Sequence, residues 1–302
     1  MKITFLGTGS MMPTKERSAF SILVSHENEN ILVDCGEGTQ RQLRFIEFSP
    51  AKITKILITH WHGDHVLGLP GLIQTLAASN YQKTLEIYGP KGTKNFIKKI
   101  MGLFVMVMEE KLKIKIIEIT KNGIFYENNL IKLESIRLQH TTSCLAYSIT
   151  EANKRKINLD YLKKFGLVKH PLLGNLQKGS PIIYKGKKIT PEKATFIKMG
   201  KKISIITDTK LCKECFNIAK NSDILICEST FMANLKNKAA EYMHLTTEQA
   251  ALIAKKSNCK KLILTHISQR YKESNSKEME NQAKKIFKDS CVARDLLIIN
   301  TN

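Results

Sequence analysis

The hexapeptide HWHGDH occupies residues 60–65 and places three histidines and one aspartate within six positions. A β-rich run leads directly into it, and an apolar segment with helical spacing follows. Because side chains alternate along a strand, His60 and His62 can point the same way as the chain leaves the sheet, and Asp64 and His65 then open the helix. Imidazole nitrogen and carboxylate oxygen suit zinc, with manganese or iron possible. This stretch therefore predicts a metal site at the end of a strand.

Strands and helices are expected to alternate through both halves of the chain. β-rich runs predict strands, and 3.6-residue spacing of apolar side chains predicts helices. In the first half we expect strands at 2–7, 29–36, 52–60, 85–90, 113–119, 130–140 and 145–150, with helices at 66–79 and 92–104. In the second half we expect strands at 202–209, 223–230, 261–266 and 295–300, with helices at 212–221, from 247, and at 276–288. The common rhythm predicts an α/β sandwich of two similar halves.

The charge balance favours a polyanionic partner. The 302 residues contain 48 Lys and Arg against 27 Asp and Glu, a formal net charge of +21. Such a surplus suits nucleic acid or an anionic membrane surface, although a lysine-rich genome would also produce it. We expect no membrane-spanning helix, because no apolar run approaches the roughly 20 residues that one needs.

Half of this surplus lies in one segment. Residues 151–202 hold 14 Lys and Arg against three acidic residues, with weak apolar periodicity and scattered Gly and Pro. We interpret residues 151–197 as a projecting insertion and not as part of the hydrophobic core.

The cysteines suit a reducing compartment. There are seven, an odd number without the spacing of a disulfide framework, which favours a cytoplasmic location. Cys212 and Cys215 form a single C-x-x-C, which we interpret as incidental because no second pair completes a zinc site and no redox context surrounds it.

Further candidate ligands close three other β-rich runs. His140 follows SIRLQ, Asp208 follows ISIIT, and His266 follows LILT. Each alone is more typical of a structural residue. Together with residues 60–65 they predict a metal centre whose ligands come from the ends of several strands.

The motif H-x-H-x-D-H resembles that of the metallo-β-lactamase superfamily, and further segments are similar to one of its families, the short form of tRNase Z (ribonuclease Z). These segments include FLGTGS, VDCGEGTQRQL, HLTTEQAA and LTHISQRY. Two others depart from the family pattern: PTKERS has Ser18 in place of Asn, and CEST has Cys227 and Ser229 in a box that reads H-E-A-T. The resemblance implies a single αββα metallo-β-lactamase domain over 1–302, with residues 151–197 inserted as a tRNA-binding arm.

The resemblance also implies a role for each candidate residue. One zinc would take His60, His62 and His140, a second would take Asp64, His65 and His266, and Asp208 would bridge them. Glu228 would orient His244 as the proton donor, with Asp64 as a further catalytic residue. Lys15 and Arg17 would hold substrate phosphate or block a tRNA that already has its mature 3′ end. Asp34 would support the metal ligands through hydrogen bonds or serve only to form a turn.

The implied activity is zinc-dependent removal of the 3′ trailer from precursor tRNA, leaving a 3′-hydroxyl on the tRNA and a 5′-phosphate on the trailer. A homodimer with two zinc ions per chain is expected from the resemblance, and the cysteine content favours the cytoplasm. A broad zinc phosphodiesterase of the same superfamily is the alternative enzyme, and an inactive RNA-binding scaffold is the alternative of another class. A β-lactamase or glyoxalase II would explain the motif but not the charge.

Overall fold

The computed structural model describes residues 1–79, 81–103 and 112–301. It divides into two compact units, one made of Met1–Thr150 with Lys201–Asn302 and the other of Glu151–Gly200. No helix in the described ranges is both long and apolar enough to cross a membrane.

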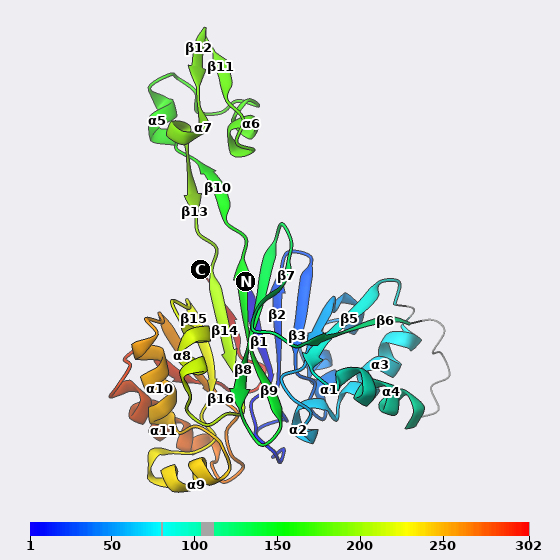
Figure 1. Ribbon diagram of the computed structural model, residues 1–302. Coiled ribbons are helices and arrows are strands. Elements are labelled where there is room, and N and C mark those ends of the chain that lie inside the picture. Colours follow the sequence, from blue (N-terminus) through cyan, green and yellow to red (C-terminus); the bar gives the residue numbers. More distant parts are fainter. Residues whose placement is uncertain (80, 104–111, 302) are drawn as a thin grey trace. The chain divides into compact units, whose positions relative to one another are not determined.

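The larger unit is built on two seven-stranded sheets (Figure 1). The first sheet has, in spatial order, the strands β18 (Ile298–Asn300), β1 (Lys2–Gly7), β2 (Ser21–His26), β3 (Glu29–Val33), β4 (Lys55–Leu57), β5 (Thr84–Pro90) and β6 (Lys113–Ile119). The second has β17 (Ser290–Val292), β16 (Lys261–Thr265), β15 (Ile224–Glu228), β14 (Lys202–Ile206), β9 (Ser143–Glu151), β8 (Ile131–Gln139) and β7 (Gly123–Glu127). In each sheet antiparallel strands lead into a parallel set, β3 to β6 in one and β14 to β17 in the other. The predicted similarity of the two halves is confirmed in this topology.

Helices cover the outer face of each sheet. The first sheet is followed and covered by α1 (Thr39–Phe45), α2 (Gly63–Val66), α3 (Leu69–Ala78) and α4 (Thr93–Leu103), and the second by α8 (Lys213–Ala219), α9 (Lys236–Glu241), α10 (Thr247–Lys256) and α11 (Ser276–Lys284). Short 3₁₀ turns lie at Pro50–Lys52, Ala233–Leu235 and Glu273–Asn275. Pro70 sits in the first turn of α3, where its missing N–H costs nothing. The last residue of the helix expected at 92–104 lies outside the described residues.

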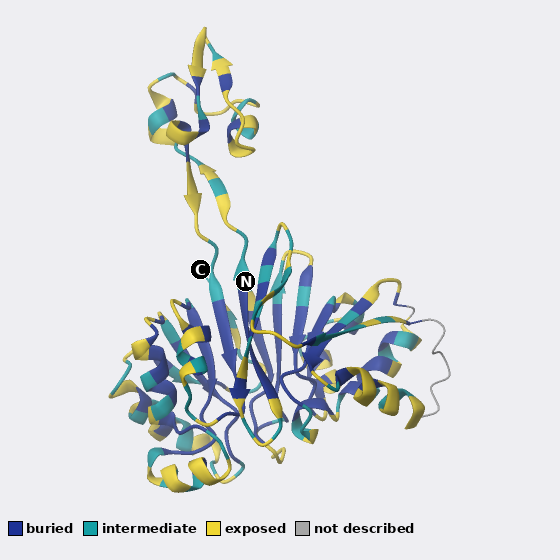
Figure 2. Ribbon diagram, in the orientation of Figure 1, coloured by how far each residue is buried: buried dark blue, intermediate teal, exposed yellow. Residues whose placement is uncertain are grey.

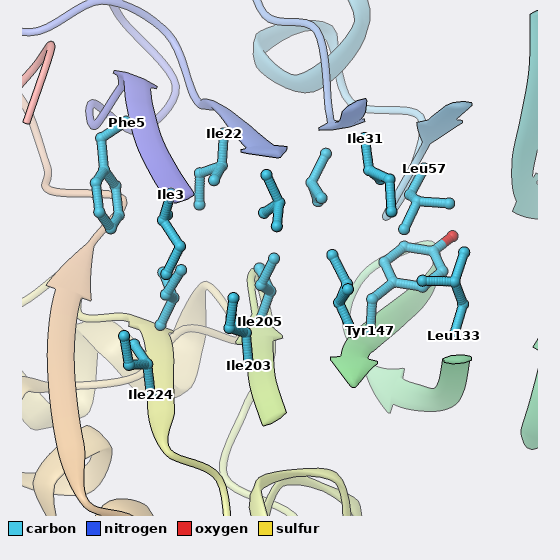
Figure 3. Packing of buried hydrophobic residues seen from close by; sticks show 14 of the residues in the cluster. Ile3, Phe5, Ile22, Ile31, Leu57, Leu133, Tyr147, Ile203, Ile205 and Ile224 are labelled. Atoms are coloured by element: carbon cyan, nitrogen blue, oxygen red, sulfur yellow. The ribbon is translucent and has the colours of Figure 1, made fainter. Parts of the chain in front are cut away.

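The layers follow from how apolar side chains alternate along the strands. Ile3, Ile22 and Ile31 point into the space between the sheets, while their neighbours Leu23 and Leu32 pack against the helices. Both faces of these strands are buried over most of their length (Figure 2), and their apolar runs at 22–24 and 31–33 are typical of strands covered on both faces. Between the sheets, side chains of the first sheet meet those of the second, as Figure 3 shows for Ile3, Phe5, Ile22, Ile31 and Leu57 against Leu133, Tyr147, Ile203, Ile205 and Ile224. The αββα sandwich is therefore confirmed.

The two sheets are joined by hydrogen bonds directly before HWHGDH. The N–H of Leu145 donates to the carbonyl oxygen of Thr59 over 2.9 Å. Two residues on, the buried hydroxyl of Tyr147 donates to the carbonyl of Ile58 over 2.6 Å. A buried Tyr hydroxyl without a partner would be costly, so this pair fixes how β9 lies against the end of β4 and thereby positions the loop that carries HWHGDH.

The smaller unit has a core of its own. It contains β10 (Lys154–Ile157), α5 (Leu159–Lys163), α6 (Leu173–Gln177), β11 (Ile182–Tyr184), β12 (Lys187–Ile189), α7 (Pro191–Ala194) and β13 (Thr195–Lys198). Its buried side chains are Leu162, Leu167, Leu176, Ile182, Ile189 and Ala194. None of these side chains belongs to the hydrophobic clusters of the larger unit. This separate core shows no apolar period in the sequence, because its short elements bury only one or two apolar side chains each.

Candidate metal centre

The candidate ligands lie where strands end. His60 and His62 follow β4, His140 follows β8 directly, and His266 follows β16 directly. Asp208 comes two residues after β14, which runs parallel to β15 and β16. Parallel strands bring their carboxyl ends to one edge of a sheet, where sites are usually found. All seven predicted ligands meet at this edge in two overlapping groups.

Three histidines and Asp208 form the first group. His62 Nδ1 is 3.1 Å from His60 Nε2 and 3.3 Å from His140 Nε2. Asp208 Oδ2 lies 3.7 Å from the same two Nε2 atoms. Ligands of a tetrahedral metal at 2.0–2.1 Å are roughly 3.3 Å apart, so these nitrogens have the spacing that such an ion needs.

Hydrogen bonds on the far side of these rings decide which nitrogen carries the proton. Thr59 donates its hydroxyl to Asp34 Oδ2 over 2.7 Å, so its oxygen can only accept from His60 Nδ1, 3.0 Å away. His140 Nδ1 likewise donates to the carbonyl oxygen of Met243 over 3.2 Å. In the neutral rings of His60 and His140 the bare Nε2 therefore points into the group.

Asp64, His65, Asp208 and His266 form the second group. The Nε2 atoms of His65 and His266 are 3.2 Å apart. Asp208 Oδ1 is 3.3 Å from the first and 3.1 Å from the second. Asp64 Oδ2 lies 3.4 and 3.5 Å from the same two nitrogens. The ligand atoms of two carboxylates and two imidazoles thus converge on one position, where a metal ion could bind all four.

The second group is oriented in the same way as the first. His65 Nδ1 donates to Asp34 Oδ2 over 2.6 Å. Thr230 donates its hydroxyl to Glu228 Oε2 over 2.6 Å, so its oxygen accepts from His266 Nδ1, 3.0 Å away. The inward nitrogens of both neutral rings are again bare. This pattern of outer partners is the one that orients metal-binding histidines.

Such convergence of lone pairs and carboxylates requires a positive charge at its centre. A proton on His65 can supply part of it: burial lowers the pKa of His65, but Asp208 and Asp34 raise it well above its usual value. Burial would raise the pKa of Asp208, yet His266, His65 and His60 hold it well below its usual value, so this carboxylate stays ionised. Its buried Oδ1 has no hydrogen-bond partner within the described structure. The residues fit a metal ion, and this edge of the sandwich is a metal-binding site.

The backbone is strained at two of these positions. Asp34 and His266 both have φ of 56°, in the left-handed region that costs most residues about 1–3 kcal/mol. Close packing adds to this, because a Cβ on Gly36 would lie 2.4 Å from the carbonyl oxygen of Asp64. Only glycine fits there. At Asp34 and His266 the left-handed backbone aims the side chain at the metal centre.

His244 and Glu228 lie beside the two groups. His244 Nδ1 is 3.2 Å from Glu228 Oε1, and Asp208 Oδ2 is 3.9 Å from the same nitrogen. Burial lowers the pKa of His244, but the Glu228 carboxylate raises it to about 9. His244 lines a pocket of about 260 Å³ together with Ser10, Met11, Thr230, Phe231, Lys238, Tyr242, Ser268, Gln269 and Arg270.

The two residues expected to hold phosphate differ in their exposure to solvent. Lys15 is exposed. Arg17 is only 3% exposed, and its guanidinium donates to Thr8 Oγ1, to the carbonyl oxygen of Ala293 and to Ser276 Oγ, at 2.7, 2.8 and 3.0 Å. The expectation that Arg17 holds phosphate disagrees with this placement, because its donors are turned into the protein. Through these hydrogen bonds Arg17 holds the loop before β2 against the C-terminal part of the chain.

Sequence reasoning missed the residues that orient the ligands. Thr59 directly precedes the metal motif, and Thr230 ends the segment CEST, so their positions carried a signal. Met243 contributes only its carbonyl oxygen, and no side-chain pattern could reveal that.

Comparison with known proteins decides the family. Residues 1–161 match the family model described as Anti-Pycsar protein Apyc1. The chain is 41% identical over 274 residues to ribonuclease Z of Nanoarchaeum equitans (strain Kin4-M), covering 90% of this chain and 85% of that protein. It is 37% identical over 303 residues to ribonuclease Z of Bacillus mycoides (strain KBAB4), covering 98% of each. The chain belongs to the ribonuclease Z family.

Solved structures agree with membership of the ribonuclease Z family. Human tRNase Z, short form, superposes with a TM-score of 0.73 at 27% identity and full coverage of both chains. The metallo-β-lactamase fold protein YhfI from Bacillus subtilis superposes with a TM-score of 0.71 at 18% identity, covering 99% of this chain and 98% of that one, which supports the fold.

Proposed function

We propose that this chain is a zinc-dependent endoribonuclease that removes the 3′ trailer from precursor tRNA. The observation that carries the proposal is the metal centre: seven ligand side chains converge at one edge of the sandwich, in a chain whose curated relatives are named ribonuclease Z. The net charge of +21 suits a polyanionic substrate.

The donor set favours two zinc ions per chain. His60, His62 and His140 are proposed to hold one ion and Asp64, His65 and His266 the other, with one oxygen of Asp208 directed to each group. Imidazole and carboxylate are ligands that zinc accepts readily. When bound, a pair of ions lowers the pKa of water and offsets charge on the reacting phosphodiester.

His244 is proposed as the proton donor to the departing 3′ oxygen. Glu228 accepts from its Nδ1 and keeps the ring protonated, so Nε2 carries a proton that can be given up. Thr209 N–H also donates to Glu228 Oε1, over 2.8 Å, which holds the carboxylate in place. The proposed products are tRNA with a 3′-hydroxyl and a trailer with a 5′-phosphate.

Two other features are proposed to bind RNA. The unit Glu151–Gly200 holds 12 Lys and Arg against three acidic residues. Lys15 is exposed on the loop that Arg17 fastens. Lysine contacts of this kind fix position on a phosphate backbone and carry little sequence information. Homodimerisation and a cytoplasmic location stay predictions.

A direct test is to incubate the zinc-loaded protein with a precursor tRNA that has a 3′ trailer and to map both product ends. Cleavage directly after the unpaired discriminator nucleotide, with the ends named above, is expected. A cyclic phosphate on the tRNA would contradict the proposal, because it arises from attack by the 2′-hydroxyl. Cleavage of a small phosphodiester alone, with the precursor intact, would favour the broad phosphodiesterase instead.

A further inference from the structure

The seven cysteines differ in how far their thiols are exposed to solvent. All are free thiols; Cys212 and Cys291 are half-buried, and the other five are buried. Cys212 directly precedes α8, the helix that links the parallel strands β14 and β15. Its Sγ is 3.5 Å from Sγ of Cys215. The expectation that no redox context surrounds this C-x-x-C disagrees with its place in a β-α-β unit, because a C-x-x-C in such a unit is typical of redox-active pairs.

We propose that Cys212 and Cys215 are a redox-active dithiol that reacts with small disulfides by thiol–disulfide exchange. This modification site shares no ligand atom with the metal centre and does not depend on the proposed function.

The reaction has two balanced steps. The Cys212 thiolate attacks one sulfur of the small disulfide, forms a mixed disulfide and releases the first small thiol. Cys215, after losing its proton to solvent, attacks Sγ of Cys212 and releases the second. The pair is oxidised by two electrons and the small disulfide is reduced to two thiols. An excess of small thiol reverses both steps.

The surroundings assign the two roles. Cys212 is the accessible member, and hydrogen bonds from Cys215 lower its pKa to about 7 despite burial, so much of it is thiolate near neutral pH. Cys215 is fully buried, and both its hydrogen bond to Cys212 and burial raise its pKa. An external disulfide reaches Cys212 first, and Cys215 resolves the adduct from within.

The dithiol lies close in sequence and structure to residues of the metal centre. The hydroxyl of Thr209 is 4.0 Å from Cys212 Sγ, and its N–H donates to Glu228 Oε1. Thr209 also follows Asp208 directly. The proposed disulfide therefore lies at the start of α8, directly after the segment between β14 and α8 that carries Asp208 (Figure 1).

The test uses the reduced, zinc-loaded full chain in glutathione and glutathione disulfide at varied ratios and neutral pH. After acid quenching and alkylation, peptide mass spectrometry reads out each cysteine. We expect a Cys212–Cys215 disulfide whose fraction rises with the share of glutathione disulfide and falls again on adding glutathione. Cys215→Ser should stop at a glutathione adduct on Cys212.

Cys291 is the matched control within the same protein. It is also half-buried, but burial raises its pKa. Cys212 should therefore react about tenfold faster than Cys291, since rate follows thiolate fraction, partly offset by lower nucleophilicity. Absence of the disulfide at every ratio, or equal rates at Cys212 and Cys291 in the unaltered chain, would overturn the proposal. Because the readout is mass, failure of tRNA cleavage does not affect it.

Discussion

His65 Nε2 and His266 Nε2 face each other across 3.2 Å. Each ring donates its Nδ1 proton to an oxygen that can only accept, so in the neutral rings both Nε2 atoms carry a lone pair and no proton. Their residues are 201 positions apart in the chain. Two bare nitrogens are stable at this separation only with a cation or a proton between them. Metal and proton therefore compete for one place, and metal binding should release protons.

The first prediction concerns Asp34, whose carboxylate accepts from His65 Nδ1 and from both the N–H and the hydroxyl of Thr59. Asp34→Asn keeps the shape but loses the charge that fixes His65. Zinc affinity should fall by about 10- to 100-fold, as is usual for such outer partners. Competition with a chelator measures it. Asp223→Asn is the matched control, since Asp223 accepts from a backbone N–H and two lysines outside the metal centre.

The second prediction concerns His244. His244→Ala should slow the chemical step of precursor cleavage by roughly 10² to 10⁴, the range for a lost general acid, with zinc content unchanged. Single-turnover kinetics measures the step. Loss of zinc from this variant would show that His244 is a ligand instead, since Glu228, His244 and His266 form a further group of potential metal ligands.

The third prediction is the pH dependence of that step. A general acid works only while protonated, so activity should fall as pH rises through the pKa of His244, about 9. Glu228 is what raises this pKa, so Glu228→Gln should move the fall to lower pH. A pH–rate profile of both proteins on the same precursor decides it. An unchanged profile would mean that Glu228 does not act through His244.

The fourth prediction separates Lys15 from Arg17. Arg17→Ala removes buried hydrogen bonds to Thr8, Ala293 and Ser276 and should lower the free energy of unfolding by about 1–3 kcal/mol. Lys15→Ala should leave stability unchanged and make precursor binding weaker and less dependent on salt. Denaturant unfolding and binding at several salt concentrations test both. Equal stability of the two variants would contradict the burial of Arg17.

The metal motif could be predicted because its ligands are neighbours in the sequence, and the strand ends could be predicted because apolar residues recur regularly along the strands. His60, His62, Asp64 and His65 share six positions, and apolar runs marked the strands that end at the other ligands. The left-handed backbone of His266 and the burial of Arg17 depend on contacts across the whole chain. No sequence period could show them.

Shorter or edge elements were missed for a different reason. β17 has three residues and β7 lies at the edge of its sheet, so neither shows enough alternation to stand out. The core of Glu151–Gly200 was missed likewise, since helices of four or five residues complete barely one turn.

The most direct measurement is native mass spectrometry of the zinc-loaded chain beside single variants, with cleavage assayed on the same samples. The account predicts two zinc ions per chain, one lost in His62→Ala, both weakened in Asp208→Ala, and cleavage abolished in each variant. A metal-free preparation that cleaves precursor tRNA at the full rate would contradict it.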